Sequence, residues 1–161
     1  MRRLLAIDPG PVESAYVVWD GVTVLDHGKV LNSVVRSSLG TRIEFREINY
    51  CAIEMIASYG MPVGAEIFET CVWIGRFMEI WEKDRAIWTF RDTIRITRNE
   101  IKNHLCHSSK AKDSNIRQAL IDRLGAPGTK KAPGITYGLA GDEWAALAVA
   151  VTVWDKMEGR A

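Results

Sequence analysis

The stretch Leu4-Leu5-Ala6-Ile7-Asp8-Pro9-Gly10 decides the fold, because it joins a buried strand to an acidic turn. Four apolar residues in succession, bounded by turn-forming residues, are typical of a strand inside a protein core. The Pro-Gly pair after Asp8 interrupts any regular element and indicates a turn. We therefore expect Asp8 to lie at the end of a buried strand.

Outward from this stretch, β-rich runs alternate with turn residues. Residues 14–19 and 22–25 are two such runs, and the Asp20-Gly21 pair between them predicts a hairpin, since its turn needs positive φ. The third strand is expected to end near Val30. Residues 49–54 predict a fourth strand that ends in the acid Glu54, and residues 86–90 predict a fifth strand.

Helical signals fill the remaining chain. Apolar residues at helical spacing predict a long amphipathic helix from Pro62 to about Lys83, at Val63, Ile67, Cys71, Ile74, Met78 and Trp81. Thr97-Arg98-Asn99-Glu100 has the form of a capping box and predicts a short helix to about Leu105. Three further helices are expected at residues 33–39, 113–124 and 142–156, and an irregular loop at residues 125–138. This order predicts an α/β fold, a ribonuclease H-like mixed five-stranded sheet flanked by helices.

Composition fits one globular domain of residues 1–161. Hydrophobic residues make up 47% and charged residues 25% of the 161 positions, an ordinary balance for such domains. No apolar run approaches the roughly 20 residues that span a bilayer, and the four-residue run after Arg3 is too short for a signal peptide. We expect a soluble cytoplasmic protein with no membrane partner, and its three cysteines as buried free thiols.

Basic residues gather in one segment although the whole chain carries a net charge of only +1. Residues 91–131 hold ten basic and four acidic side chains, a net of +6. Such a segment favours one face toward an anionic partner, because phosphate contacts supply most of the affinity in nucleic-acid binding. On charge alone, an ordinary solvated helical surface explains the segment equally well.

Three acids stand at the ends of predicted elements: Asp8, Glu54 and Asp142. If the first and fourth strands are neighbours, the ends of these strands converge and bring Asp8 beside Glu54. Clustered carboxylates repel one another unless a cation holds them, and oxygen ligands suit Mg²⁺ or Mn²⁺. Asp8 before Pro-Gly also fits a simple turn, and Asp142 after Gly141 a simple helix cap, so the acids alone leave a metal site open.

Five motifs in register resemble the RuvC family of Holliday junction resolvases over nearly the whole chain. They are Leu5-Ala6-Ile7-Asp8-Pro9-Gly10 with Ala15-Tyr16-Val17-Val18, Ala52-Ile53-Glu54, Ile74-Gly75-Arg76, Ile101-Lys102 with Lys110-Ala111-Lys112-Asp113, and Asp142-Glu143-Trp144-Ala145-Ala146-Leu147-Ala148-Val149-Ala150. One position departs from the family pattern. The family places an acid three residues after the first acid or His of the last motif, and here that position is Ala145. A residue at this spacing shares a helical face with Asp142, so the site has lost one carboxylate.

The resemblance implies a metal-dependent endonuclease that resolves Holliday junctions and other branched DNA by phosphodiester hydrolysis. Asp8, Glu54 and Asp142 would be the catalytic residues and would hold Mg²⁺ or Mn²⁺, two ions per site, with Glu143 as a substitute ligand. The implied DNA contacts are Lys102, Lys110, Lys112, Lys130, Lys131 and Tyr59, the last in a loop over residues 55–61. The resemblance also implies a homodimer that binds a four-way junction, and a small, divergent resolvase suits a bacteriophage acting in the host cytoplasm.

Other functions remain open from the sequence. Ala145 and the basic segment also fit a non-catalytic branched-DNA-binding protein of the same fold, and an RNA-processing nuclease of this fold is a further alternative. An Asp and a Gly after the first strand also occur in sugar-kinase and actin-like nucleotide-binding folds. Those proteins need two such domains, and 161 residues hold one.

Overall fold

A five-stranded sheet forms the centre of the molecule in the computed structural model, which describes residues 2–41, 48–58, 60, 62–83 and 92–160. The strand order is β3-β2-β1-β4-β5. The first three strands are antiparallel, whereas β4 and β5 run parallel to β1. The strands are β1 (Leu4–Asp8), β2 (Glu13–Trp19), β3 (Val24–Leu31), β4 (Tyr50–Met55) and β5 (Ile94–Thr97).

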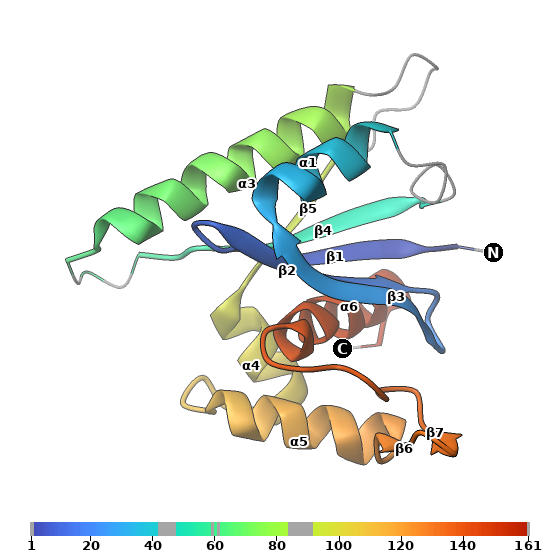
Figure 1. Ribbon diagram of the computed structural model, residues 1–161. Coiled ribbons are helices and arrows are strands. Elements are labelled where there is room, and N and C mark those ends of the chain that lie inside the picture. Colours follow the sequence, from blue (N-terminus) through green and yellow to red (C-terminus); the bar gives the residue numbers. More distant parts are fainter. Residues whose placement is uncertain (1, 42–47, 59, 61, 84–91, 161) are drawn as a thin grey trace.

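Helices cover both faces of this sheet (Figure 1). One face carries α1 (Asn32–Thr41) and α3 (Ala65–Lys83), and the other carries α4 (Arg98–Cys106), α5 (Asp113–Leu124) and α6 (Glu143–Met157). A small ribbon of β6 (Gly128–Thr129) and β7 (Ala132–Pro133) follows α5. The predicted α/β class, a mixed five-stranded sheet flanked by helices, is confirmed.

Strand alternation divides the interior into two cores. In β1, Leu4 and Ala6 pack into the core that contains α6, while Leu5 and Ile7 pack into the core under α1 and α3. Because both faces of the strand are buried, its sequence is a continuous apolar run and not an alternating one. The next residue, Asp8, belongs to the face of Leu4 and Ala6, which is the face covered by α6.

Helix α6 is the most enclosed element among the described residues. Every residue from Ala146 to Asp155 is buried, and the helix contacts β1 and β2 on one side and α4 and α5 on the other. A helix in this position needs small or apolar residues on all sides, which explains its Ala- and Val-rich sequence. Asp142, the N-cap residue of α6, lies at the edge of this core.

Several local predictions are confirmed. Thr97 and Glu100 form the expected capping box at the start of α4, and α5 has the predicted bounds, with Gly125 at its C-cap. In the Asp20-Gly21 turn, Gly21 has a φ of +97°, as that hairpin requires. No helix among the described residues is long and apolar enough to cross a membrane.

Other details differ from the sequence prediction. The strand expected at residues 86–90 lies outside the described residues, and the strand that pairs with β4 is Ile94–Thr97. The buried face of α3 consists of Thr70, Ile74, Phe77 and Trp81, so the helix is rotated from the expected face. Cys51 is buried, but Cys71 is exposed and Cys106 half-buried, so the prediction of three buried thiols was wrong for two of them. The loop expected at residues 125–138 contains the β6–β7 ribbon.

Candidate functional site

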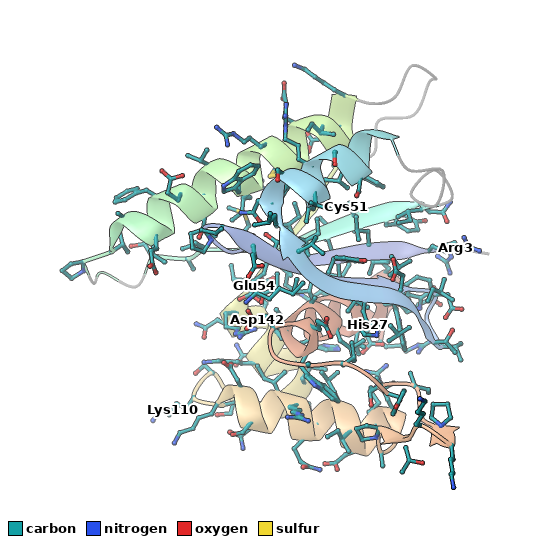
Figure 2. All side chains as sticks on the ribbon, viewed as in Figure 1. Arg3, His27, Cys51, Glu54, Lys110 and Asp142 are labelled. Carbon is teal, nitrogen blue, oxygen red and sulfur yellow. The ribbon has the colours of Figure 1, made fainter. Side chains whose placement is uncertain are left out.

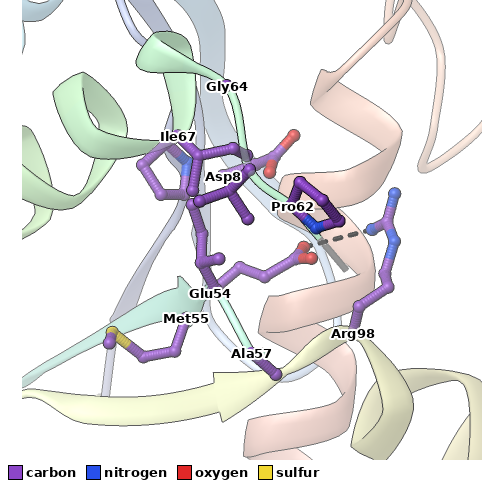
Figure 3. A pocket seen from close by; sticks show the side chains of 11 residues that line it. Asp8, Glu54, Met55, Ala57, Pro62, Gly64, Ile67 and Arg98 are labelled. Carbon is purple, nitrogen blue, oxygen red and sulfur yellow. Dashed lines mark hydrogen bonds and ion pairs between the residues drawn. The ribbon is translucent and has the colours of Figure 1, made fainter. Parts of the chain in front are cut away.

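Strand register brings Asp8 and Glu54 together. Parallel pairing of β1 with β4 sets Ile7 opposite Ile53, so the next residue on each strand follows at the same level. Both acids are half-buried, and by alternation both project toward the face covered by α6. Figure 3 shows their carboxylates pointing into the same cavity.

Asp142 approaches the same site from the start of α6. It occupies the N-cap position, yet its side chain makes no capping hydrogen bond. Instead, Lys29 Nζ lies 2.8 Å from Asp142 Oδ2. The simple helix-cap explanation of Asp142 therefore fails, and the carboxylate remains on the side of the sheet where Glu54 lies (Figure 2).

The carboxylates of Glu54 and Asp142 both act electrostatically on Asp8. Burial, together with the carboxylates of Glu54, Asp142 and Asp113, raises the pKa of Asp8 to about 7 against the opposing effect of Arg98. Burial also raises the pKa of Glu54, which Arg98 and Lys102 lower and Asp113 raises. Repulsion between carboxylates at this edge of the sheet is the condition that favours binding of a cation.

Arg98 forms a bridge within this acidic site. Its Nη1 donates to Glu54 Oε2 over 3.1 Å, and its Nη2 donates to Asp113 Oδ1 over 3.0 Å. The capping box positions Arg98 as the first residue of α4, and Asp113 is the first residue of α5. The two helix starts therefore meet the end of β4 through one guanidinium.

Two adjoining cavities open on the site. A cavity of about 400 Å³ is lined by Asp8, Glu54 and Arg98 and walled by residues of the segment 55–67. Arg98 also lines a second cavity of about 300 Å³, together with Asp113, Asp142 and Ala145. Tyr59 lies outside the described residues, but Ile56, Ala57 and Pro62 line the first cavity, so the described part of this loop lies beside the acids.

The available ligands are the carboxylate oxygens of Asp8, Glu54 and Asp142, and a hard divalent cation prefers ligands of this kind. As the side chains lie, however, Arg98 and Lys29 are paired with Glu54 and Asp142. Within the described part of the chain, no three His, Cys, Asp or Glu side chains converge closely enough to hold a metal ion. Binding of an ion therefore requires some side chains to turn.

Glu143, the predicted substitute ligand, is engaged elsewhere. Its Oε2 accepts a hydrogen bond from the Ala140 backbone N–H over 2.8 Å and lies 3.1 Å from His27 Nδ1. Its side chain is only 12% exposed. The structure thus separates Glu143 from the group formed by Asp8, Glu54 and Asp142.

The predicted DNA-contact lysines fall into two groups. Lys102 on α4 is half-buried and favours ionised Glu54, and Lys110 and Lys112 are exposed at the start of α5, where Figure 2 labels Lys110. Lys130 and Lys131 are exposed at the turn between β6 and β7. That turn follows the far end of α5, and a helix of 12 residues is about 18 Å long. The lysines near the acids are therefore Lys102, Lys110 and Lys112.

Sequence reasoning missed Arg98 and Asp113. Arg98 was one of ten basic residues in its segment, and 44 positions separate it from Glu54. Asp113 stood in a recognised lysine motif but had no assigned role. The capping box gave the only available signal, because it fixed the start of α4 and so the position of Arg98.

Comparisons with known proteins support the fold. No family model matches the chain, and no curated protein matches it significantly. Among solved structures, RuvC of Thermus thermophilus matches with a TM-score of 0.67 and 18% identity, over 99% of this chain and 98% of that one. The same protein in complex with a Holliday junction substrate matches with a TM-score of 0.69 and 16% identity, over 100% and 98%. The chain therefore has the fold of RuvC.

Proposed function

We propose that residues 1–161 form a single nuclease domain that resolves Holliday junctions and other branched DNA by metal-dependent phosphodiester hydrolysis. The observation that carries this proposal is that Asp8, Glu54 and Asp142 lie on one face of the sheet, where burial and the neighbouring acids raise the pKa of Asp8 to about 7. The similarity to a RuvC structure that holds a Holliday junction substrate supports the choice of DNA.

In this proposal the three acids are the metal ligands and the catalytic residues. A bound Mg²⁺ or Mn²⁺ supplies Lewis acidity toward the phosphate and lowers the pKa of water. Asp8, the most central acid, would hold the ion from β1, Glu54 from the neighbouring strand β4, and Asp142 from the start of α6. The half-buried positions of Asp8 and Glu54 limit competition from bulk water and strengthen their electrostatic effect.

The basic segment provides the DNA contacts. Lys102, Lys110 and Lys112 lie on the acidic side of the molecule, so each is placed to bind a backbone phosphate near the acids. Lys130 and Lys131 follow the other end of α5 and contact the DNA farther along one arm of the junction. Tyr59 stacks on a base from the loop whose described residues line the cavity beside Asp8 and Glu54.

Two copies of the chain form the active assembly, because paired cuts in opposing strands need two sites related by a two-fold axis. The exposed apolar face of α3 supports this. Phe68 is 62% and Val72 46% exposed, at a spacing that shares one helical face. Cys71 is exposed beside them. Large apolar side chains grouped on a helix surface are typical of association sites.

Cleavage of a labelled four-way junction tests the proposed activity. Wild-type protein with Mg²⁺ or Mn²⁺ is expected to cut the junction into nicked duplexes, and Asp8→Asn is expected to bind it without cutting. Linear duplex and flapped DNA of the same sequence define the breadth of substrates. Equal cleavage by wild type and Asp8→Asn would refute the assignment of Asp8, and intact junction in every metal would refute the enzyme.

A non-catalytic branched-DNA-binding protein is the second candidate, and one observation favours it. Glu54 and Asp142 are already paired with Arg98 and Lys29, and Ala145 supplies no carboxylate. The same assay separates the two functions, since this candidate predicts a shifted junction band without any nicked product.

A further inference from the structure

The charges around Asp8 are balanced for one divalent ion. Four carboxylates line the two cavities that share Arg98: Asp8 and Glu54 line the first, and Asp113 and Asp142 line the second. When ionised they carry four negative charges. Arg98 and Lys29, which pair directly with them, neutralise two, and the remaining two equal the charge of a single Mg²⁺ or Mn²⁺.

Arg98 occupies the centre of this arrangement. It lines both cavities, the one containing Asp8 and Glu54 and the one containing Asp142 and Ala145. Its guanidinium is held on two sides, by Glu54 and by Asp113, and its side chain is only 28% exposed. Arginine does not lose its proton in proteins, so this positive charge is permanent.

The carboxylate expected from the family pattern is missing beside Arg98. Ala145 lies three residues after Asp142 and lines the same cavity as Arg98 and Asp113. A second ion in this cavity would lack the acid at 145, would find one Asp113 oxygen bonded to Arg98, and would be repelled by the guanidinium. Loss of the acid and presence of the arginine therefore have the same electrostatic effect.

We propose that this site binds one divalent ion and that Arg98, anchored by Asp113, takes the place of the second. The ion binds near Asp8, with Glu54 and Asp142 as its other ligands, while the guanidinium stays beside Glu54 as a fixed cation. Lys102 is left for the DNA. This inference rests on the proposed function and replaces the two ions implied by the resemblance.

Counting bound Mn²⁺ tests the inference directly. Titration calorimetry and electron paramagnetic resonance of the full chain are expected to give one ion per chain for wild type. The double variant Arg98→Gln/Ala145→Asp is expected to bind two, because it removes the competing cation and restores a ligand. Arg95→Gln, on an exposed position of β5, is the matched control and is expected to remain at one.

Junction cleavage at saturating metal gives the second readout. Arg98→Gln is expected to retain metal affinity but to cut about a hundredfold more slowly, since removal of one preorganised electrostatic contact often has that effect. Arg98→Lys keeps the charge without the planar fork and is expected to lie between the two. Weaker Mn²⁺ binding by a folded Arg98→Gln would instead indicate a merely structural role and overturn the inference.

The outcomes separate this inference from the function on which it rests. Two ions per wild-type chain together with junction cleavage would overturn the role of Arg98 and leave the nuclease intact. Wild-type rates for Arg98→Gln would do the same. A wild-type protein that neither binds Mn²⁺ nor cleaves the junction would overturn both this inference and the proposed function.

Discussion

Asp8 and Glu54 follow directly after Ile7 and Ile53, which are register partners on two parallel strands. The pKa of each acid is raised above its ordinary value. Burial, with the Glu54 carboxylate as the next cause, raises the pKa of Asp8 from 3.8 to about 7. The folded state therefore binds a proton more tightly than the unfolded state. This contribution to stability is complete below about pH 3.8 and is lost as the pH rises through about 7.

Asp8→Asn is expected to unfold at a higher temperature than wild type above pH 7 in the presence of a chelator, because it removes a buried negative charge. Each kcal/mol corresponds to about 2–4 °C in a chain of this size. The difference is expected to shrink toward pH 4, where wild-type Asp8 is protonated. Thermal melts monitored by circular dichroism at several pH values measure it, with the exposed Asp92→Asn as control. Saturating Mn²⁺ is expected to raise the melting temperature of wild type and not that of Asp8→Asn. An equal rise in both proteins would contradict the role of Asp8 as a metal ligand.

Asp155 holds α4, α5 and α6 together from inside the core. Its side chain is 3% exposed and receives two hydrogen bonds from Arg123, with His104 Nε2 2.8 Å from its Oδ2. Burial raises its pKa, but the bonds from Arg123 and His104 outweigh that effect and lower it. This stabilisation is present above the unfolded pKa of 3.8 and is lost as the pH falls through the lower folded value.

Asp155→Asn is expected to cost about 2–4 kcal/mol of unfolding free energy at pH 7, because it leaves the Arg123 guanidinium without its countercharge. Urea titration measures the loss. Asp122→Asn on the exposed surface of α5 is expected to change stability by less than about 0.5 kcal/mol. A comparable loss in both variants would show that the buried ion network has no special role.

Lys112→Ala is expected to weaken binding of a four-way junction and to reduce the slope of log affinity against log salt by about 0.9, the change for one lost phosphate contact on duplex DNA. Lys110→Ala is expected to behave in the same way, and Lys130→Ala to have a smaller effect because it lies beyond the far end of α5. Lys83→Ala, at the end of α3 on the other face of the sheet, serves as the control. Fluorescence anisotropy between about 50 and 200 mM salt gives these slopes. Equal slopes for all variants would place the DNA on another face.

Phe68→Glu is expected to shift the protein from dimer to monomer in analytical ultracentrifugation, because it sets a charge in the apolar face of α3. Monomers are expected to release single nicks without paired cuts in a junction. Val22→Glu changes a residue of nearly equal exposure, 63% against 62%, in the β2–β3 turn and is expected to leave the dimer intact. A dimeric Phe68→Glu would refute this face as the interface.

Local patterns predicted most of the fold because each needs only neighbouring residues. The capping box at Thr97 and the Gly125 stop gave correct helix ends. The strand Ile94–Thr97 was missed because it has four residues and its last one is also the N-cap of α4. Phe77 was not assigned to the buried face of α3, because Val63 and Cys71, which are exposed, fit a helical apolar spacing as well as the buried residues do.

The site was predictable only in part. The positions of Asp8 and Glu54 follow from strand ends, which sequence can show. The bridge from Arg98 to Glu54 and Asp113 depends on how three elements meet in space, and no local pattern encodes such a meeting. The ion pair between Lys29 and Asp142 has the same origin.

The enclosure of α6 also bears on changes in chain length. The sheet and the neighbouring helices pack around residues 146–155 on all sides. Packing of α6 therefore fixes the distance from Asp142 to the ends of β1 and β4, and the length of the segment between α5 and α6 does not. Insertions at the exposed tip between Thr129 and Ala132 should then leave the acids where they are. That tip offers a place to attach a label or a second DNA-binding module without displacing the three acids.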